Sequence, residues 1–165
     1  MGTFKDENPI TYRIEKMRKN WSENVCDATQ LVRWVLLKDE VRMFKAFSLL
    51  EASEHGQIPD LFLNFDVSFS TPEQYGLDLL NSWLVIWDSE DARAEVEHAD
   101  VIPDWDDKPF RDAPVKKSEE TFLEAMSTFA TSIDPDQQLV LGVTPAGYMG
   151  EPGFLDWVLK CLEVM

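Results

Sequence analysis

Residues 60–69 carry the clearest strand pattern in the chain. Pro59 and Pro72 flank a stretch that is rich in β-branched and aromatic residues, as strands are. Side chains of one parity are all apolar, while the other parity begins with an aromatic ring and ends polar: Leu61, Leu63, Phe65, Val67 and Phe69 against Phe62, Asn64, Asp66 and Ser68. The pattern predicts a central strand that is covered on both faces at its start and open to solvent at its C-terminal end.

Helical periodicity recurs along the rest of the chain, where apolar side chains return every three or four positions. The first such stretch places four of them on one stripe: Ile14, Met17, Trp21 and Val25. The predicted helices cover residues 8–27 (with Thr11 as an alternative start), 39–54, 71–87, 118–133 and 152–164, and residues 92–99 suit a shorter one.

Local signals mark several ends of these helices. Thr71 before Pro72 predicts an N-cap, and Gln74 three positions later would complete a capping box. By the same logic, Asp39 and Ser118 are expected to cap their helices. Gly56 is expected to end the second helix in the left-handed conformation.

Two further apolar runs complete the predicted sheet. Residues 139–143 suit a short strand that stops at Thr144, and residues 30–37 suit either a strand or a continuation of the first helix. The strand is favoured for 30–37, because the run turns directly into charged residues. A strand, a helix and the strand 60–69 in succession are typical of a βαβ unit, whose strands are parallel.

The order of elements predicts an α/β fold. We expect one domain over residues 1–165, in which a small, mostly parallel sheet of about three or more strands is flanked by amphipathic helices as a three-layer sandwich. The length suits one domain, and a hydrophobic fraction of 44% argues against disorder.

The net charge of −16 limits the partners that the chain can bind. Residues 88–107 hold nine acids against one arginine, which gives this segment a net charge of −8. Nucleic acid is not an expected partner, because phosphate binding requires lysine and arginine. The basic residues of the first helix, around Arg13 and Lys16, suit a solvated face or a contact with an acidic partner.

The sequence also predicts a cytoplasmic protein without membrane segments. No apolar run reaches the length of a bilayer span, and the first residues lack the apolar region of a secretory signal. Cys26 and Cys161 lie in apolar-periodic stretches, so both are expected to be buried free thiols.

The weak candidates for a ligand site lie where the strands of an α/β sheet end, which is where such sheets bind ligands. They are Asp66, Ser68 and Ser70 after the first strand, with Thr144 and Gly147 after the last. Carboxylate and hydroxyl oxygens could hold Mg²⁺, and a hydrogen-bonded strand end explains them equally well. The chain has no phosphate-binding glycine motif and no metal-ligand spacing, so we expect no cofactor and no metal.

The last predicted helix is apolar over more than one side. A stripe from Phe154 to Leu162 can face the sheet, while Leu155 and Leu159 fall together on a second side. We expect these two leucines to be covered by a second copy of the chain, or by further structure if the chain is the N-terminal module of a longer protein.

Three function classes follow from these patterns. The first is a non-catalytic protein-interaction or scaffold module, favoured because apolar helix faces abound while catalytic motifs are missing from the sequence. The second is an enzyme or nucleotide-binding domain with its site at the strand ends. The third is an acidic inhibitor that mimics nucleic acid or blocks a basic partner.

Overall fold

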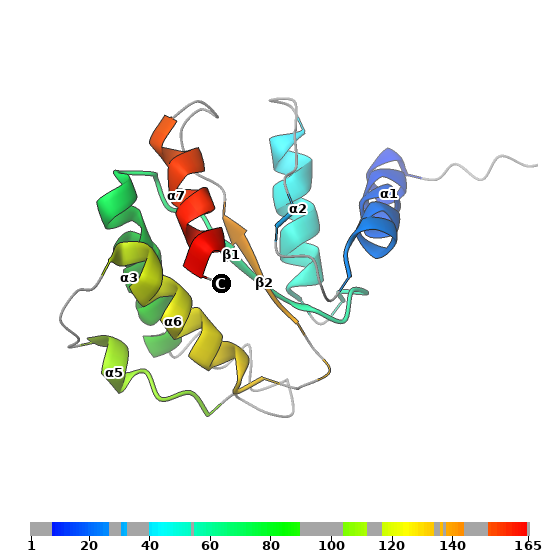
Figure 1. Ribbon diagram of the computed structural model, residues 1–165. Helices are drawn as coiled ribbons and strands as arrows, with labels where there is room; N and C mark the ends of the chain where they lie inside the picture. Colours follow the sequence, from blue (N-terminus) through cyan, green and yellow to red (C-terminus); the bar gives the residue numbers. More distant parts are fainter. Residues whose placement is uncertain are drawn as a thin grey trace, which may run out of the picture. The chain divides into compact units, whose positions relative to one another are not determined.

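A computed structural model describes residues 8–26, 31–32, 40–53, 55–89, 104–111, 117–133, 136, 138–143 and 152–164. These residues form six helices and two strands, shown in Figure 1. In chain order they are α1 (Pro9–Asn24), α2 (Val41–Glu51), β1 (Leu61–Phe65), α3 (Pro72–Asp88), α5 (Lys108–Arg111), α6 (Ser118–Ala130), β2 (Leu139–Val143) and α7 (Pro152–Val164).

The fold is mixed helix and sheet, and β1 and β2 form a parallel two-stranded sheet. The predicted strand 139–143 is confirmed in both its bounds. Most of the predicted strand 30–37 lies outside the described residues, so a third strand and a three-layer arrangement stay predictions. Gly142 of β2 lies against the side chain of Asn64 in β1, which would have to move if position 142 carried a Cβ.

The strand prediction for residues 60–69 is too long at its C-terminal end. β1 stops at Phe65, and the exposed side chains that follow it belong to irregular backbone. There the carbonyl of Val67 accepts a hydrogen bond from the hydroxyl of Tyr75 at 3.2 Å. The carbonyl of Val67, which in a longer strand would bond a neighbouring strand, is therefore bonded by a side chain of α3.

The chain divides into two compact units, Met1–Phe62 and Leu63–Met165, and the division falls inside β1. Unit 1 therefore contains α1, α2 and the start of β1. Unit 2 contains the rest of β1 and every later element. Buried residues at the two ends of β1 belong to different cores, since Phe62 packs in unit 1 and Phe65 packs in unit 2.

Aromatic rings form the core of unit 1. Trp21 of α1 lies 5.1 Å from Phe62, and Phe47 of α2 lies 6.4 Å from the same ring, measured between ring centroids. The indole of Trp21 donates a hydrogen bond to Asp60 at 3.3 Å, so its polar atom is satisfied at the edge of this core. The predicted stripe of α1 is confirmed, with Trp21 buried and the other members partly buried.

The predicted start of the first helix at Asn8 is confirmed, whereas its end and both ends of the second helix need small corrections. Asn8 is the N-cap of α1, and its side chain accepts a hydrogen bond from the amide of Ile10 at 3.0 Å. Glu40 is the N-cap of α2, while Asp39, the predicted cap, lies outside the described residues. Gly56 does not adopt the left-handed conformation; it is needed because a Cβ would meet the carbonyl oxygen of Glu51 at 2.5 Å.

In unit 2, α3, α6 and α7 pack against one another (Figure 1). Helices α3 and α6 approach most closely at Gly76, where a Cβ would lie 2.3 Å from the carbonyl oxygen of Ser118. The hydroxyl of Ser118 donates to the carbonyl of Pro72 at 3.0 Å. The starts of the two helices are therefore held together by backbone contact as well as by side chains.

The predicted cap Ser118 is wrong, and the predicted cap Thr71 is confirmed in its position but not in its hydrogen bond. Ser118 is the first residue of α6 and not its N-cap, which is Lys117, because its buried hydroxyl is engaged by α3. Thr71 does occupy the N-cap position of α3, but its side chain makes no capping hydrogen bond. The reciprocal bond of the capping box is also not formed between Thr71 and Gln74, and the side-chain nitrogen of Gln74 donates to Asp78 at 3.0 Å.

A second aromatic cluster lies at the other end of α3. Trp83 and Trp87 contact Trp105 and Phe129, with ring centroids 5.0 to 6.2 Å apart. The indole of Trp105 donates to the hydroxyl of Thr128 at 3.0 Å. The helical turn α5 follows Trp105 in the chain, and its Phe110 stacks on Trp105.

The two cysteines differ in exposure. Cys161 is buried in α7, as predicted, but Cys26 is exposed, so the prediction of a second buried thiol is wrong. Cys26 follows the end of α1 at Asn24, beyond the helix whose stripe holds the buried Trp21. Among the described helices, none is long and apolar enough to cross a bilayer.

Candidate functional site

The polar residues after β1 form a hydrogen-bonded corner of unit 2. The side chains of Asp66, Ser68 and Ser70 are all exposed. The hydroxyl of Ser70 donates to one carboxylate oxygen of Asp78 at 2.7 Å, while Gln74 donates to the other. This corner therefore ties the segment after β1 to the first turns of α3.

The hydroxyl of Tyr75 lies close to the carboxylates of this corner, and its pKa responds to their charge. Burial raises the pKa of the Tyr75 hydroxyl, and the nearby carboxylates of Asp66 and Asp78 raise it further. The hydroxyl thus keeps its proton and stays a donor to the carbonyl of Val67. Sequence reasoning missed Asp78, although its position four residues after Gln74 on a helix is a usable signal.

The other half of the predicted strand-end site is not described. Thr144 and Gly147 lie outside the described residues, so the structure does not test whether they join Asp66 and Ser70. Within the described chain, no group of three or more His, Cys, Asp or Glu residues is placed to hold a metal ion. The observed hydrogen bonds suit a fixed strand end, which is one of the two explanations left open above.

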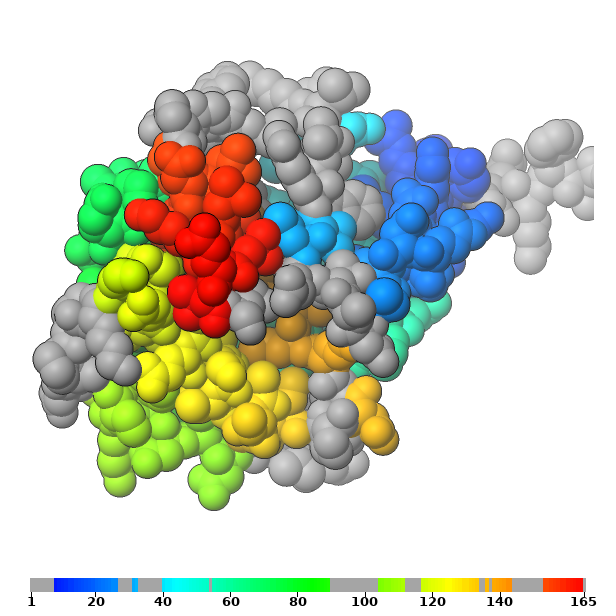
Figure 2. Space-filling model, viewed as in Figure 1, coloured from blue at the N-terminus to red at the C-terminus, as the bar shows by residue number. Residues whose placement is uncertain are grey.

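Helix α7 presents two different sides. Its inner side holds the buried residues Trp157 and Cys161, and the Trp157 ring lies 5.0 Å from that of Tyr75. Its outer side carries Leu155 and Leu159, which are 53% and 49% exposed. In the space-filling view of Figure 2, α7 (red) lies at the surface beside α6 (yellow). We call Leu155 and Leu159 the α7 ridge.

Charged side chains border the α7 ridge. Asp156, Lys160 and Glu163 are all exposed on the same helix. The neighbouring helices α3 and α6 contain no lysine or arginine at all. Lys117, the N-cap of α6, pairs with Glu120 and lies near Glu163, so the ridge is an apolar strip bordered by acids with two lysines among them.

Other exposed apolar residues occur on different elements, apart from Val164 at the end of α7. Val85 and Ile86 are adjacent on α3, and Leu49 projects from α2 in unit 1. Single exposed apolar residues are normal on protein surfaces. The two leucines of the α7 ridge differ from them, because they are one helical turn apart and so form a continuous strip.

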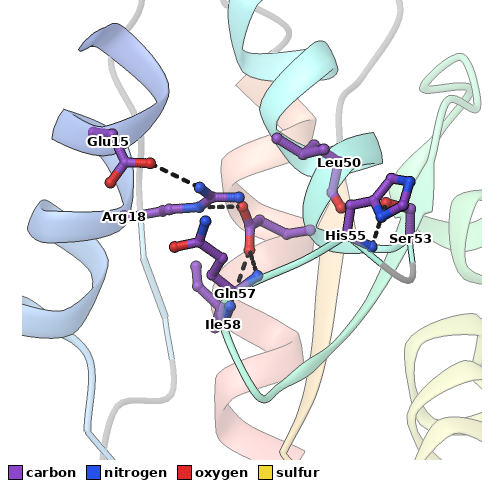
Figure 3. A network of polar contacts seen from close by, with 8 residues as sticks. Glu15, Arg18, Leu50, Ser53, His55, Gln57 and Ile58 are labelled. Carbon is purple, nitrogen blue, oxygen red and sulfur yellow. Dashed lines mark hydrogen bonds and ion pairs between the residues drawn. The ribbon is translucent and has the colours of Figure 1, made fainter. Parts of the chain in front are cut away.

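A buried carboxylate in unit 1 is the remaining candidate for function. The side chain of Glu51 has no exposed surface, and one of its oxygens accepts from Nε of Arg18 at 2.7 Å. The other oxygen accepts from the backbone amides of Gln57 and Ile58 at 2.8 and 3.0 Å. Figure 3 shows Arg18, Gln57 and Ile58 converging on this group, with Glu15 on the outer side of the guanidinium.

The hydrogen bonds of Glu51 define a structural role. Both carboxylate oxygens are engaged, as a buried charge requires. They connect α1 to α2 and to the turn that leads into β1. Sequence reasoning missed this network, because Arg18 lies 33 positions from Glu51 and no local pattern couples them.

Comparisons with known proteins do not identify a relative. The sequence matches no protein-family model, no curated protein and no solved structure. The residues of this chain must therefore carry any functional conclusion.

Proposed function

We propose that this protein is a non-catalytic protein-interaction module that binds a partner through the outer side of α7. One observation carries the proposal: Leu155 and Leu159 form an exposed apolar strip on a helix whose other side is already packed in the core. Adjacent exposed apolar side chains on a folded surface mark sites of interaction.

The free energy gained by burying the two leucines limits the affinity that the ridge alone can give. Burying an exposed leucine completely stabilises a complex by about 1.5–3 kcal/mol, so a half-exposed leucine contributes roughly 1 kcal/mol. The two together supply about 2 kcal/mol, whereas a micromolar complex needs about 8 kcal/mol. The ridge is thus an anchor, and residues around it must supply the rest of the affinity.

Site-specific photo-crosslinking tests the proposal directly. A benzophenone amino acid replaces Leu155 in one variant and Leu49 in a matched control, and the full chain is irradiated in the cells that make it. We expect a discrete cross-linked product from position 155 only, and its loss when Leu159→Asp is added. Equal products from both positions, or none from position 155, would contradict the proposal.

A further inference from the structure

The charge of the chain is distributed very unevenly between the two units. Unit 1 contains ten acids and nine lysine or arginine residues, a net charge of −1. Unit 2 contains 21 acids and six lysine or arginine residues, a net charge of −15. Almost the whole charge of the protein therefore belongs to the unit that carries the α7 ridge.

The described helices of unit 2 show the same bias. Together α3, α6 and α7 hold eight acids and one basic residue, Lys160. Asp156 directly follows the first ridge leucine, and Glu163 lies four residues after the second, where the helix repeat returns to the same side. Both carboxylates are exposed, so a molecule that covers the ridge also meets them.

From the ridge and this charge together, we infer that the α7 ridge binds a basic protein surface, one that carries apolar side chains among lysine or arginine residues. The inference rests on the proposed function and names the class of partner. Opposite charges speed the encounter of two proteins and exclude wrong partners. Charged pairs around an apolar anchor also supply contacts beyond those of the two leucines.

A second copy of the chain fits this surface poorly. A symmetric contact of α7 with α7 would bring together two units of net charge −15 each. Like charges at an interface oppose association, and the ridge alone offers little apolar area in compensation. We therefore expect the chain to be a monomer at micromolar concentration, with its ridge free for a partner of opposite charge.

Three synthetic helical peptides make the test specific. The first carries leucines at i and i+4 with lysines elsewhere, the second has glutamate in place of lysine, and the third keeps lysine but replaces the leucines with serine. Binding of the full chain to each is measured by fluorescence anisotropy. We expect the lysine–leucine peptide to bind at least tenfold more tightly than either of the others.

Variants of the chain separate ridge binding from simple attraction between charges. The double substitution Leu155→Asp with Leu159→Asp makes the chain more acidic, so unspecific attraction to a basic peptide would strengthen. We expect binding to weaken at least tenfold instead. Val85→Asp, at an exposed apolar position of α3 in the same unit, should leave the affinity within twofold. Raising the salt from about 0.1 to about 1 M, which shortens the Debye length from about 10 to about 3 Å, should also weaken binding.

The outcomes distinguish this inference from the proposed function. Equal binding of the lysine–leucine and glutamate–leucine peptides through the ridge would overturn the basic partner and leave an interaction module. A dimer in sedimentation equilibrium that dissociates on Leu155→Asp would do the same, with a second copy as the occupant. Unchanged binding to the double variant would overturn both the inference and the proposed function.

Discussion

Units 1 and 2 each contain a core that excludes water, but the charged residues of the two units differ in number and in pairing. In unit 1, acids and bases are nearly equal in number, and one carboxylate, that of Glu51, is buried against Arg18. In unit 2, acids outnumber basic residues by 21 to six. Aromatic rings pack at both ends of α3 there. Unit 2 also buries an acid, Glu119, so the comparison teaches that the two units differ in the arginine partner of their buried acid and not in burial of a carboxylate as such.

The strongest way to break this comparison is to remove one ring from each core. Phe62→Ala and Phe65→Ala change positions three residues apart in β1, and each should lower the free energy of unfolding by about 3–5 kcal/mol through loss of a buried ring. Hydrogen exchange should show the loss of protection mainly in α2 for Phe62→Ala and mainly in α6 for Phe65→Ala. Equal losses in both helices for either variant would mean that the two units unfold as one.

The next test concerns the ion pair that distinguishes unit 1. Glu51→Ala leaves Arg18 buried without its inner partner and two amides without an acceptor, so we expect a loss of about 3 kcal/mol in urea denaturation. Glu15→Ala is the matched control, because Glu15 bonds the same arginine from the exposed side at 2.9 Å. It should cost less than 1 kcal/mol. Similar losses in the two variants would show that the buried pair does not form in solution.

Alkaline pH should lower the free energy of unfolding through a buried thiol of unit 2. Burial, together with the charge of Glu119, raises the pKa of the Cys161 thiol from 9.0 to about 12. The folded chain then holds this proton more tightly than the unfolded chain, so the free energy of unfolding falls as the pH rises from about 9 to about 12. The slope from this group is at most about 1.4 kcal/mol per pH unit.

Denaturation at pH 8 and pH 10 measures this effect. Cys161→Ala should reduce the fall in stability, whereas Cys26→Ala, at the exposed thiol of unit 1, should leave it unchanged. Above pH 10 the buried hydroxyl of Tyr75, whose pKa is also raised, adds to the fall in the same direction. An identical pH profile for both cysteine variants would contradict the burial of Cys161.

The smallest expected effect compares two helix caps. Asn8→Ala should cost about 1 kcal/mol, because its side chain bonds the amide of Ile10 at the start of α1. Thr71→Ala should cost only a few tenths of a kcal/mol, because its side chain makes no such bond in α3. Thermal unfolding of both variants checks the pair. A larger loss for Thr71→Ala would restore the capping role that the sequence predicts.

The sequence predicted those features that depend on local periodicity. The stripe of α3 is an example, because Tyr75, Leu79 and Trp83 are buried as their helical spacing predicts. The exposure of Leu155 and Leu159 followed from the same reasoning. Such features need only the period of a helix and one buried side, so distant residues do not change them.

Features set by distant neighbours could not be predicted in this way. Ser118 has the side chain of an N-cap, but the carbonyl of Pro72, 46 positions earlier in the chain, takes its hydroxyl. At the candidate site, Ser70 bonds Asp78, a residue that no strand pattern includes, and the rest of that site stays a prediction. A polar side chain bonds the partner that the tertiary fold brings near, and the spacing of residues in the sequence does not reveal which partner that is.

The contact at Gly76 restricts how the sequence of this protein can change over evolution. The carbonyl oxygen of Ser118 lies where any Cβ at position 76 would be, so even alanine requires one helix to move. A distant descendant that keeps the crossing of α3 and α6 should thus keep glycine at this position, and a small residue that can bond backbone near position 118. A search for remote relatives can use this pair of positions, 42 residues apart, as a filter where overall similarity has faded.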